Sequence, residues 1–558
     1  MTLSEFQKKL ARHGYDAYIL TRGNMFLGQD ILPEENKIRE LTGFSGSAGT
    51  LIVSPEKSWL LVDGRYELQA AREVDAAQTE VVCTADTVGS WIGANFLTPF
   101  KIAYNPWCHS VNEVDYWQRV LKKHSFIADD ADLPGPRLAA KEVEIFEHDI
   151  EFCGVSAEEK ISWLTRFMTE QNLDAYFVAA CDAVSWLLNL RSDCLPDTPI
   201  LRAFALIDKD GGVSLFTSDM RKAEAEIAAL KGRTVGLACA KTPKQIQLLM
   251  KKHKIRLENI ANPIDNWKAV KNPVELAGIR KAHVRDGVAV VKFLHWLENS
   301  RQPVDELGVV RELRRFRAEQ TNFYSDSFGT IAAFGPNGAV VHYQPTAATD
   351  CRLEPGSILL LDSGAQYFDG TTDVTRTIAV GEPPAEIKDS FTQVLKAHIA
   401  VADAYFPAGT GGSALDALAR AQLWKFGKGY HHGTGHGVGC FLNVHEGPFS
   451  LSAKNSQLLD AGMVTSIEPG YYKEGAYGIR IENLACVVPA KNPRFDEPML
   501  KFEPLTLVPL DKRLISKYLL TAAEINWLNT YHAEVWQKLH GYLDAETAEW
   551  LRQACAPL

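Results

Sequence analysis

The sequence lacks paired cysteines, and this absence bears on where the protein works. Its ten cysteines are scattered along 558 residues without a Cys-x-x-Cys pair. Such spacing favours reduced, mostly buried thiols over a disulfide framework or a zinc ribbon. The start of the chain reads as an amphipathic helix with Leu3, Phe6 and Leu10 on one stripe, without the apolar run of a signal peptide. We therefore expect a cytoplasmic protein.

Long apolar runs and basic blocks are also missing. No window approaches the ~18 consecutive apolar residues that a membrane helix needs. Lysine and arginine total 59 against 69 aspartates and glutamates, so the net charge is −10. An acidic chain without a basic block is a poor candidate for binding nucleic acid or an anionic membrane. An apolar content of 46% and a charged content of 23% exclude a disordered, collagen-like or coiled-coil chain.

The first half of the chain reads as two diverged copies of one unit. Each copy has a helical apolar stripe followed by a short strand, and Asp16-Ala17-Tyr18 is echoed by Asp174-Ala175-Tyr176. Alternating helices and strands on this scale indicate α/β units. Chance similarity between two α/β units is the alternative. A polar, proline-containing stretch at about 128–159 separates the copies.

The sequence pattern changes after residues 262–273. A long amphipathic helix follows, a second helix begins near Asp305, and residues 330–488 are rich in glycine and in strand-like runs. The tail ends in helices, with a capping box at Thr521 and Glu524 and one apolar stripe formed by Leu528, Tyr531, Val535, Leu539 and Tyr542. This stripe packs on its own domain or forms a subunit interface. We predict domains at 1–140, 155–265 and 266–558, the last including a C-terminal extension at 490–558.

Two pairs of carboxylates are placed symmetrically about turn signals. Asp362 and Asp373 flank an Asp-Gly turn signal and are symmetric about positions 367–368, so a hairpin would bring them roughly opposite each other. Glu468 and Glu482 are symmetric about Gly475, and Arg480 would share a strand face with Glu482. Neighbouring carboxylates repel unless a cation or a shared proton lies between them.

A histidine lies between these pairs. His436 is surrounded by glycines in GTGHGVG, which resembles a phosphate-binding loop only superficially because no Lys-Ser/Thr follows. Taken singly, an aspartate beside glycine is usually a turn residue, and a histidine in such a loop is usually structural. Four carboxylates and one imidazole together suit two divalent ions of a harder type, such as Mn²⁺ or Co²⁺, better than a single zinc.

These residues, in this order, resemble the pita-bread metallopeptidase family, which includes aminopeptidase P, prolidase and methionine aminopeptidase. The Asp-x₁₀-Asp spacing and the runs GTGHGVG, IEPG and RIEN carry the resemblance. TIAAFGPNGAVVHYQP and LNVHEGP resemble segments with substrate-binding histidines, here His342 and His445. GFSGSAGTLIV, VDGRYELQA and WLLNLR resemble creatinase-like N-terminal domains.

The resemblance implies a fold of mixed α/β and α+β class. Two creatinase-like α/β domains would precede a pita-bread catalytic domain with a helical C-terminal extension, as in the long cytosolic X-prolyl aminopeptidases. It also implies the metal ligands, with Asp373 and Glu482 bridging two divalent ions: Asp362, Asp373, His436, Glu468 and Glu482. Mn²⁺ is the favoured ion, with Co²⁺ and Zn²⁺ as alternatives.

The implied activity is hydrolysis of the peptide bond before proline, which releases the N-terminal residue. Glu468 would be both ligand and general base, and His445 would hold the developing oxyanion. His342, His432 and Arg480 would contact substrate or product. The alternative for His432 is a purely structural role, and the alternative for Arg480 is to steady the strand of Glu482. The expected partners are peptides that begin Xaa-Pro and a second copy of the chain, without nucleic acid or membrane. The alternatives are a prolidase restricted to Xaa-Pro dipeptides and an inactive binding module on the same fold.

Overall fold

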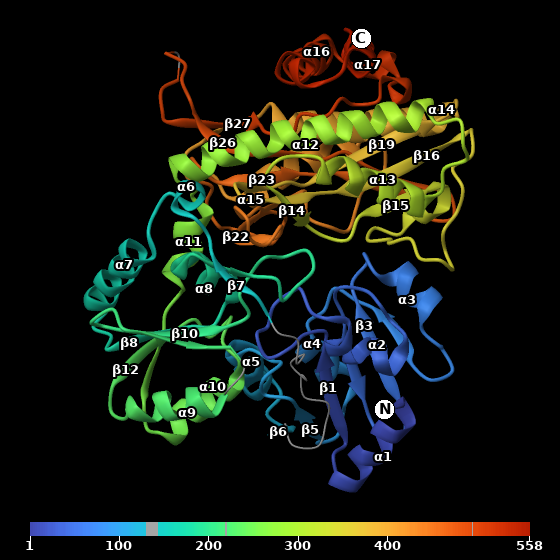
Figure 1. Cartoon of the computed structure of the whole chain (residues 1–558). Helices are drawn as coiled ribbons and strands as arrows, with labels where there is room; N and C mark the ends of the chain where they lie inside the picture. Colours follow the sequence, from blue (N-terminus) through green and yellow to red (C-terminus); the bar gives the residue numbers. More distant parts are fainter. Residues whose placement is uncertain (130–142, 218–219, 494) are drawn as a thin grey trace. The chain divides into compact units, whose positions relative to one another are not determined.

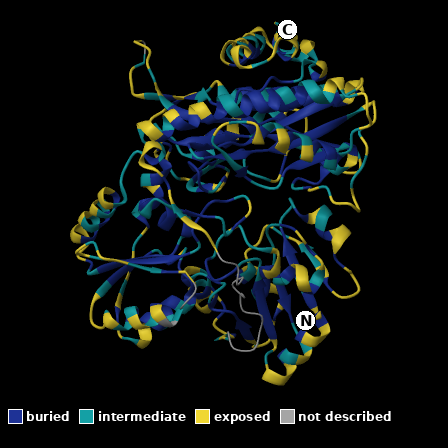
Figure 2. Cartoon of the chain, in the orientation of Figure 1, coloured by how far each residue is buried: buried dark blue, intermediate teal, exposed yellow. Residues whose placement is uncertain are grey.

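The computed structural model describes residues 1–129, 143–217, 220–493 and 495–558. The chain divides into two compact units. Unit 1 comprises Met1–Glu147, Val155–Leu195 and Ile200–Ile264, and unit 2 comprises His148–Gly154, Pro196–Pro199 and Asp265–Leu558. Within the described ranges, no helix is both long and apolar enough to cross a membrane. In both units the strands are mostly buried and the exposed residues gather on helices and loops (Figure 2).

Unit 1 contains two principal sheets with helices around them (Figure 1). The six-stranded sheet has the order β4-β3-β2-β1-β5-β6, formed by β1 (Ala17–Thr21), β2 (Thr50–Val53), β3 (Ser58–Val62), β4 (Glu80–Cys83), β5 (Lys101–Tyr104) and β6 (Ser125–Ala128). The five-stranded sheet has the order β11-β10-β8-β12-β13, formed by β8 (Ala175–Val178), β10 (Phe204–Asp208), β11 (Val213–Phe216), β12 (Thr234–Leu237) and β13 (Arg256–Asn259). β7 (Ile145–Glu147) pairs with β9 (Leu190–Ser192).

The helices of unit 1 follow the predicted alternation with strands. They are α1 (Leu3–His13), α2 (Lys37–Thr42), α3 (Glu67–Glu73), α4 (Val88–Asn95), α5 (Val111–Val120), α7 (Ala157–Glu170), α8 (Cys181–Leu188), α9 (Met220–Ala229) and α10 (Lys244–Lys252). Leu3, Phe6 and Leu10 are buried on one face of α1, as the sequence predicts.

The two sheets share one plan around their central strands. β1 pairs antiparallel with β2 and parallel with β5, and β8 pairs antiparallel with β10 and parallel with β12. The aspartate of each echoed tripeptide makes the same contact: Asp16 accepts the backbone N–H of Lys101, and Asp174 accepts that of Thr234. Each acceptor thus binds the first residue of the parallel neighbour. Shared topology and a shared contact favour two copies of one unit over chance similarity.

Unit 2 is built mainly on antiparallel strands. Its six-stranded sheet has the order β20-β27-β26-β23-β21-β22, formed by β20 (Tyr405–Pro407), β21 (Gly435–Gly437), β22 (Glu446–Leu451), β23 (Val464–Ile467), β26 (Asn483–Ala490) and β27 (Met499–Pro504). Smaller sheets are formed by β14 (Phe323–Asp326), β15 (Ile331–Phe334), β16 (Ser357–Ser363), β17 (Ala365–Tyr367), β18 (Gly370–Thr371), β19 (Val374–Val380), β24 (Gly470–Lys473) and β25 (Tyr477–Arg480).

Helices cover these sheets, with the long α12 lying across them (Figure 1). The helices assigned mainly to unit 2 are α6 (Ile150–Cys153), α11 (Pro263–Ala269), α12 (Pro273–Asn299), α13 (Glu306–Ala318), α14 (Ala385–Ala402), α15 (Gly412–Trp424), α16 (Ala522–Leu539) and α17 (Ala545–Ala554). α13 begins after its N-cap Asp305, and α16 begins with the predicted capping box of Thr521 and Glu524.

The C-terminal tail packs on unit 2. β27 pairs with β26 of the six-stranded sheet. The tail also contributes four buried members of its predicted stripe, namely Leu528, Tyr531, Val535 and Leu539. Tyr542 is the exception, because it lies beyond α16 and is 67% exposed. The two α/β sheets fall within the predicted ranges 1–140 and 155–265, and the sheets of unit 2 fall within 266–558; the boundaries themselves stay a prediction.

Candidate metal centre

The five predicted metal ligands lie at strand ends of unit 2. Asp362 is in β16, and Asp373 directly precedes β19. The other three belong to the six-stranded sheet or its extensions: His436 is in β21, Glu468 follows β23, and Glu482 lies between β25 and β26. Two separate sheets therefore contribute side chains to one place.

The glutamate hairpin has the register that the sequence predicts. β23 and β26 pair Ile467 with Asn483, and β24 and β25 pair Gly470 with Arg480. Glu468 and Glu482 consequently lie opposite each other between these two ladders. Gly475 at the centre of the turn has φ of 69°, the left-handed conformation that favours glycine.

The aspartate hairpin forms, but its register differs from the predicted one by two residues. Asp362 lies opposite Thr375, and Gly364 rather than Asp362 takes the place opposite Asp373. The turn is centred on Phe368 and Asp369, because Tyr367 at the end of β17 pairs with Gly370 at the start of β18. Contacts with α12 explain the shift: Arg285 pairs with the Asp369 carboxylate, and a Cβ on Gly370 would lie 3.0 Å from Ile279 and Ala282.

Close packing at Gly364 leads to a stability prediction. A Cβ at this position would lie 2.0 Å from the Thr372 carbonyl oxygen and 2.2 Å from Ser327 Oγ. Gly364→Ala should therefore lower the free energy of unfolding by about 1–3 kcal/mol, the usual cost of overpacking. Chemical denaturation measures this change. Gly541→Ala is the matched control, since no atom lies within 4 Å of its Cβ position; equal stability of the two variants would contradict the prediction.

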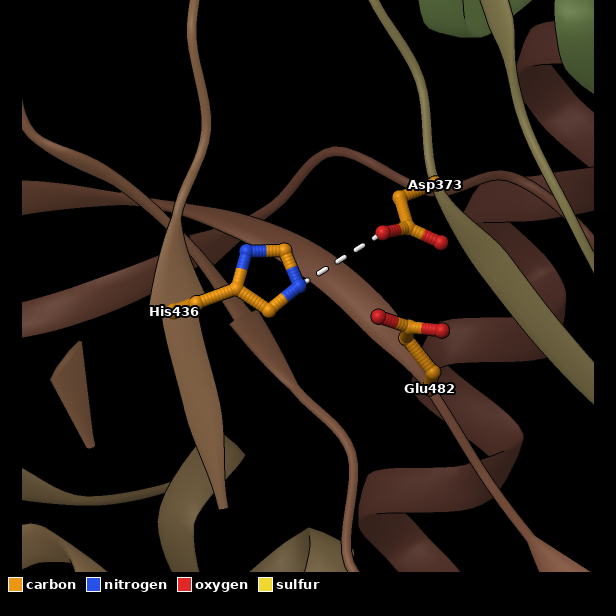
Figure 3. Close-up of side chains that lie close together, drawn as sticks. All are labelled: Asp373, His436 and Glu482. Atoms are coloured by element: carbon orange, nitrogen blue, oxygen red, sulfur yellow. Dashed lines mark ion pairs between the residues drawn. The ribbon is translucent and has the colours of Figure 1, made fainter. Parts of the chain in front are cut away.

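His436 is oriented with one ring nitrogen toward the carboxylates. Its Nδ1–H donates to the Gly437 carbonyl at 2.9 Å, which leaves a lone pair on Nε2. Nε2 lies 3.5 Å from Asp373 Oδ2 and 3.5 Å from Glu468 Oε1. One ligand atom each of Asp373, His436 and Glu482 lies within 4.8 Å of the others (Figure 3). This spacing suits coordination of a common cation.

The carboxylates are buried close to one another, and the nearby positive charge does not offset their burial and mutual repulsion. Burial, and then the charges of Asp362 and Glu468, raise the pKa of Asp373 well above its usual range. Burial and the charge of Asp373 do the same to the pKa of Glu482, and burial raises the pKa of Glu468. Each group would hold a proton more tightly than an exposed carboxyl because ionisation adds repulsion in a poorly solvated place.

Two oxygens in this cluster lack a protein partner. Among the described residues, neither Asp362 Oδ1 nor Asp373 Oδ1 has a hydrogen-bond donor, although both atoms are buried. Buried carboxylate oxygens are costly unless they are paired or bind a metal. The donor set of four carboxylates and one imidazole therefore fits divalent cations with a preference for oxygen ligands.

Arg480 starts a hydrogen-bonded chain beside the cluster. Its guanidinium pairs with Asp362 Oδ2 at 2.5 Å and donates to the Tyr472 hydroxyl at 2.7 Å. That hydroxyl donates in turn to Nε2 of His432 at 2.7 Å, whose Nδ1–H donates to the Gly433 carbonyl. Burial raises the pKa of Tyr472 to about 12 and lowers the pKa of His432 well below its usual range. At neutral pH, His432 in this series of hydrogen bonds is therefore neutral and Tyr472 keeps its phenolic proton.

The remaining predicted site histidines lie at the same place. The rings of His436 and His445 meet edge to face, with centroids 4.3 Å apart. His342 lies near His432: the pKa of His432 is lowered most by burial, then by the charge of Arg480, and less strongly by His342. The structure therefore brings together all the residues that the sequence predicts for the site.

Sequence reasoning missed several supporting side chains. Thr375 donates its hydroxyl to Glu482 Oε2 at 2.6 Å, and Ser466 donates to Glu468 Oε1 at 3.2 Å. Tyr472, which accepts from Arg480, lies diagonally across from it in the β24–β25 hairpin. Gly470 leaves room for the Tyr472 hydroxyl, because a Cβ on Gly470 would lie 2.6 Å from that oxygen. Thr375 and Ser466 each lie two residues from a predicted ligand, on the same strand face, and that alternation was the available signal.

Models of known families match nearly the whole chain. Metallopeptidase family M24 matches residues 277–489, and the C-terminal region of peptidase M24 matches residues 498–558. The Creatinase/Prolidase N-terminal domain matches twice, at residues 3–133 and 136–275. The predicted fold class, with two creatinase-like domains before a catalytic domain and a C-terminal extension, is confirmed.

Similar proteins share this organisation over their full length. A probable Xaa-Pro aminopeptidase P of Sordaria macrospora is 34% identical, with 100% of this chain and 98% of the relative covered. Aminopeptidase P1 of Lotus japonicus is 33% identical, with 100% and 99% covered. Both relatives therefore align along the N-terminal as well as the catalytic part.

Solved structures separate the X-prolyl aminopeptidases from shorter members of the fold. X-prolyl aminopeptidase of Caenorhabditis elegans, described as a cytosolic enzyme with a di-nuclear active site, is 31% identical, covers 98% of this chain and 95% of its own, and superposes with a TM-score of 0.92. Prolidase of Pyrococcus horikoshii is 25% identical and covers 63% of this chain and 99% of its own, with a TM-score of 0.52. The chain belongs to metallopeptidase family M24, in its Xaa-Pro aminopeptidase P group.

Proposed function

We propose that the chain is a metal-dependent aminopeptidase that releases the N-terminal residue from peptides with proline in the second position. The observation that carries this proposal is the buried cluster of Asp373, His436 and Glu482, with Asp362 and Glu468 beside it. It occurs in a chain that aligns from end to end with Xaa-Pro aminopeptidases P. The substrates we propose are peptides that begin Xaa-Pro.

The proposed cofactors are two divalent ions, with Mn²⁺ favoured over Co²⁺ and Zn²⁺ because most of the donors are carboxylate oxygens. Asp362, Asp373, His436, Glu468 and Glu482 would hold them. When bound, the ions would supply Lewis-acid chemistry, making a water molecule more acidic and polarising the scissile carbonyl.

The side chains around this site would move protons and hold the substrate. Glu468 would accept a proton from the attacking water and pass it to the leaving proline nitrogen. Its Oε1 accepts a hydrogen bond from Ser466, which would keep the carboxylate in a fixed orientation. His342 and His432 would contact the substrate, and Arg480 would hold Asp362 and Tyr472 in place while bordering the product.

His445 is the proposed donor to the carbonyl oxygen. Its ring lies against that of the proposed ligand His436, which would bring it close to the scissile carbonyl. His445→Ala should lower kcat by about 10²-fold, because a donor aimed at a developing oxyanion contributes most in the transition state. Steady-state kinetics together with metal analysis measures this. Loss of metal with unchanged kcat in the metal-loaded fraction would contradict the assignment.

The decisive test of the function compares three peptide classes after reconstitution with Mn²⁺. Xaa-Pro-Xaa and longer Xaa-Pro peptides should be cleaved, and Xaa-Ala-Xaa should not. Cleavage of the Xaa-Pro dipeptide alone would establish the prolidase alternative. Less than one ion per chain with no hydrolysis would establish the inactive binding module.

We also propose a cytoplasmic homodimer. All ten cysteines are free thiols, which suits a reducing compartment, and the similar Caenorhabditis elegans enzyme is described as cytosolic.

Trp424 and Phe426 at the end of α15 are 61% and 41% exposed, and large apolar side chains of this kind are enriched at subunit contacts. Light scattering at working concentration should give twice the chain mass of 61.9 kDa; the mass of one chain would refute the dimer.

A further inference from the structure

Hydrogen bonds and ring contacts lead from the back of the metal centre to the C-terminal helix α16. We infer that α16 is a positioning element, which sets the places of Glu468 and Glu482 through two separate lines of contact. This inference rests on the proposed function and deepens it, since it assigns the tail a part in metal binding. Each line ends on the backbone at a predicted ligand or next to one.

The first line runs from Tyr531 through Arg376 to Glu482. The Tyr531 hydroxyl accepts from Arg376 Nη2 at 2.9 Å and donates to the Val508 carbonyl at 2.8 Å. Arg376 Nη1 donates to the backbone carbonyl of Glu482 itself at 2.6 Å. Both Tyr531 and Arg376 are 3% exposed. One buried guanidinium therefore joins the helix to the main chain of a ligand.

The partners of Arg376 make its position depend on the tail. Besides Tyr531 and Glu482, its donors bind the uncharged oxygens of Thr375, Asn483, Val508 and Pro509. Burial lowers the pKa of Arg376, whereas the charge of Glu482 and these hydrogen bonds favour its charged form. Loss of the phenol oxygen would remove one of the three acceptors of Arg376 Nη2 and leave Asn483 and Val508. The guanidinium that binds the Glu482 carbonyl would then be less firmly fixed.

The second line runs from Trp527 through His398 to the residue before Glu468. His398 of α14 is fully buried, and its Nδ1–H donates to the Ile467 carbonyl at 3.0 Å. The Trp527 ring lies against His398 with centroids 5.8 Å apart, and it stacks on Tyr531 with centroids 5.6 Å apart and planes within 5°. Tyr531 and Trp527 therefore lie on one face of α16, and both lines start from that face.

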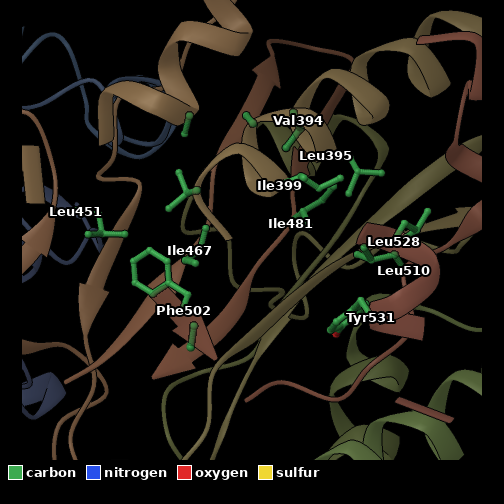
Figure 4. Packing of buried hydrophobic residues seen from close by; sticks show 14 of the residues in the cluster. Val394, Leu395, Ile399, Leu451, Ile467, Ile481, Phe502, Leu510, Leu528 and Tyr531 are labelled. Atoms are coloured by element: carbon green, nitrogen blue, oxygen red, sulfur yellow. The ribbon is translucent and has the colours of Figure 1, made fainter. Parts of the chain in front are cut away.

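A shared apolar core reinforces the two lines. Ile467 and Ile481, which directly precede the two glutamates, pack in the same core as Leu528 and Tyr531 of α16 (Figure 4). Successive side chains of a strand point to opposite faces, so each isoleucine faces this core while the next residue faces the metal centre. A displacement of α16 would therefore be transmitted to both glutamates at once.

The test uses the full-length chain and four variants. Tyr531→Phe removes only the hydroxyl that binds Arg376, and His398→Leu removes the donor to Ile467. Each should weaken Mn²⁺ binding about 10-fold, the usual effect of losing a partner that orients a ligand, and should lower kcat with KM within twofold of wild type. His398→Asn should restore both values, because its side-chain amide N–H can replace Nδ1–H. Tyr518→Phe is the matched control, as Tyr518 is 76% exposed.

Mn²⁺ affinity by calorimetry, kcat and the melting temperature are measured for each protein. Variants that melt at a lower temperature but bind Mn²⁺ and turn over like wild type would overturn the inference, since α16 would then only stabilise the fold. Failure of His398→Asn to restore Mn²⁺ affinity would overturn the second line of contact. A wild-type chain without Mn²⁺ binding would overturn the proposed function itself, which keeps the two failures distinguishable.

Discussion

Glu468→Gln is expected to lower kcat on an Xaa-Pro-Xaa peptide by about 10³-fold, because the amide cannot accept the proton that a general base removes. The substitution keeps the size of the side chain and one oxygen that can accept from Ser466. Glu468 also lies 3.5 Å from His436 Nε2 in the ligand cluster, so a weaker hold on metal should accompany the loss of the base.

Kinetics at saturating Mn²⁺ separate these two effects. Metal content restored by excess ion, with kcat still low, would identify the missing base as the main cause. Glu474→Gln is the matched control, since Glu474 is exposed in the turn of the same hairpin and should retain wild-type kcat. Near-wild-type turnover of Glu468→Gln would remove Glu468 from the proposed mechanism.

Mn²⁺ is expected to stabilise the chain more strongly as the pH rises above about 4, where exposed carboxyl groups ionise. The metal-free folded chain holds Asp373, Glu468 and Glu482 with raised pKa values. A group whose pKa is raised by folding contributes stability below its unfolded pKa, and that contribution is lost as the pH rises through the folded pKa. The metal-free protein should therefore lose unfolding free energy over this range, whereas the ionised carboxylates gain affinity for cations.

Denaturation with and without Mn²⁺, at several pH values, measures this difference. At a free Mn²⁺ concentration of about 100 times Kd, each ion should add about 2.7 kcal/mol to the free energy of unfolding. Calorimetry in buffers of different ionisation enthalpy should also show proton release on binding. Glu482→Gln removes one of the titrating groups and should flatten the pH dependence; an equal pH dependence with and without Mn²⁺ in the wild type would contradict the prediction.

Local patterns predicted the parts of the site that local contacts determine. The register of Glu468 and Glu482 follows from a single glycine turn at Gly475, so symmetry about that residue was enough. The start of α16 at Thr521 likewise depends on a capping box contained within four residues.

Contacts between distant segments decided what the sequence did not predict. The aspartate hairpin is shifted because α12, far away in the sequence, binds Asp369 and packs against Gly370. Arg376 was visible as a charge in an apolar strand, but its partners lie in the tail at Val508, Pro509 and Tyr531, and no spacing rule connects them. Tyr542 followed the helical period of the stripe, yet α16 ends before it.

The division of the ligands between two sheets has a kinetic consequence. Asp362 and Asp373 come from the β16–β19 hairpin, whereas His436, Glu468 and Glu482 come from the six-stranded sheet and its extensions. The two aspartates meet the other three ligands only when these sheets pack together. Contacts such as the Glu482 N–H donating to the Thr375 carbonyl hold the sheets in this arrangement. Interactions that form after the transition state slow unfolding and leave the folding rate nearly unchanged. Bound ions should therefore lengthen the lifetime of the native state without hastening its formation.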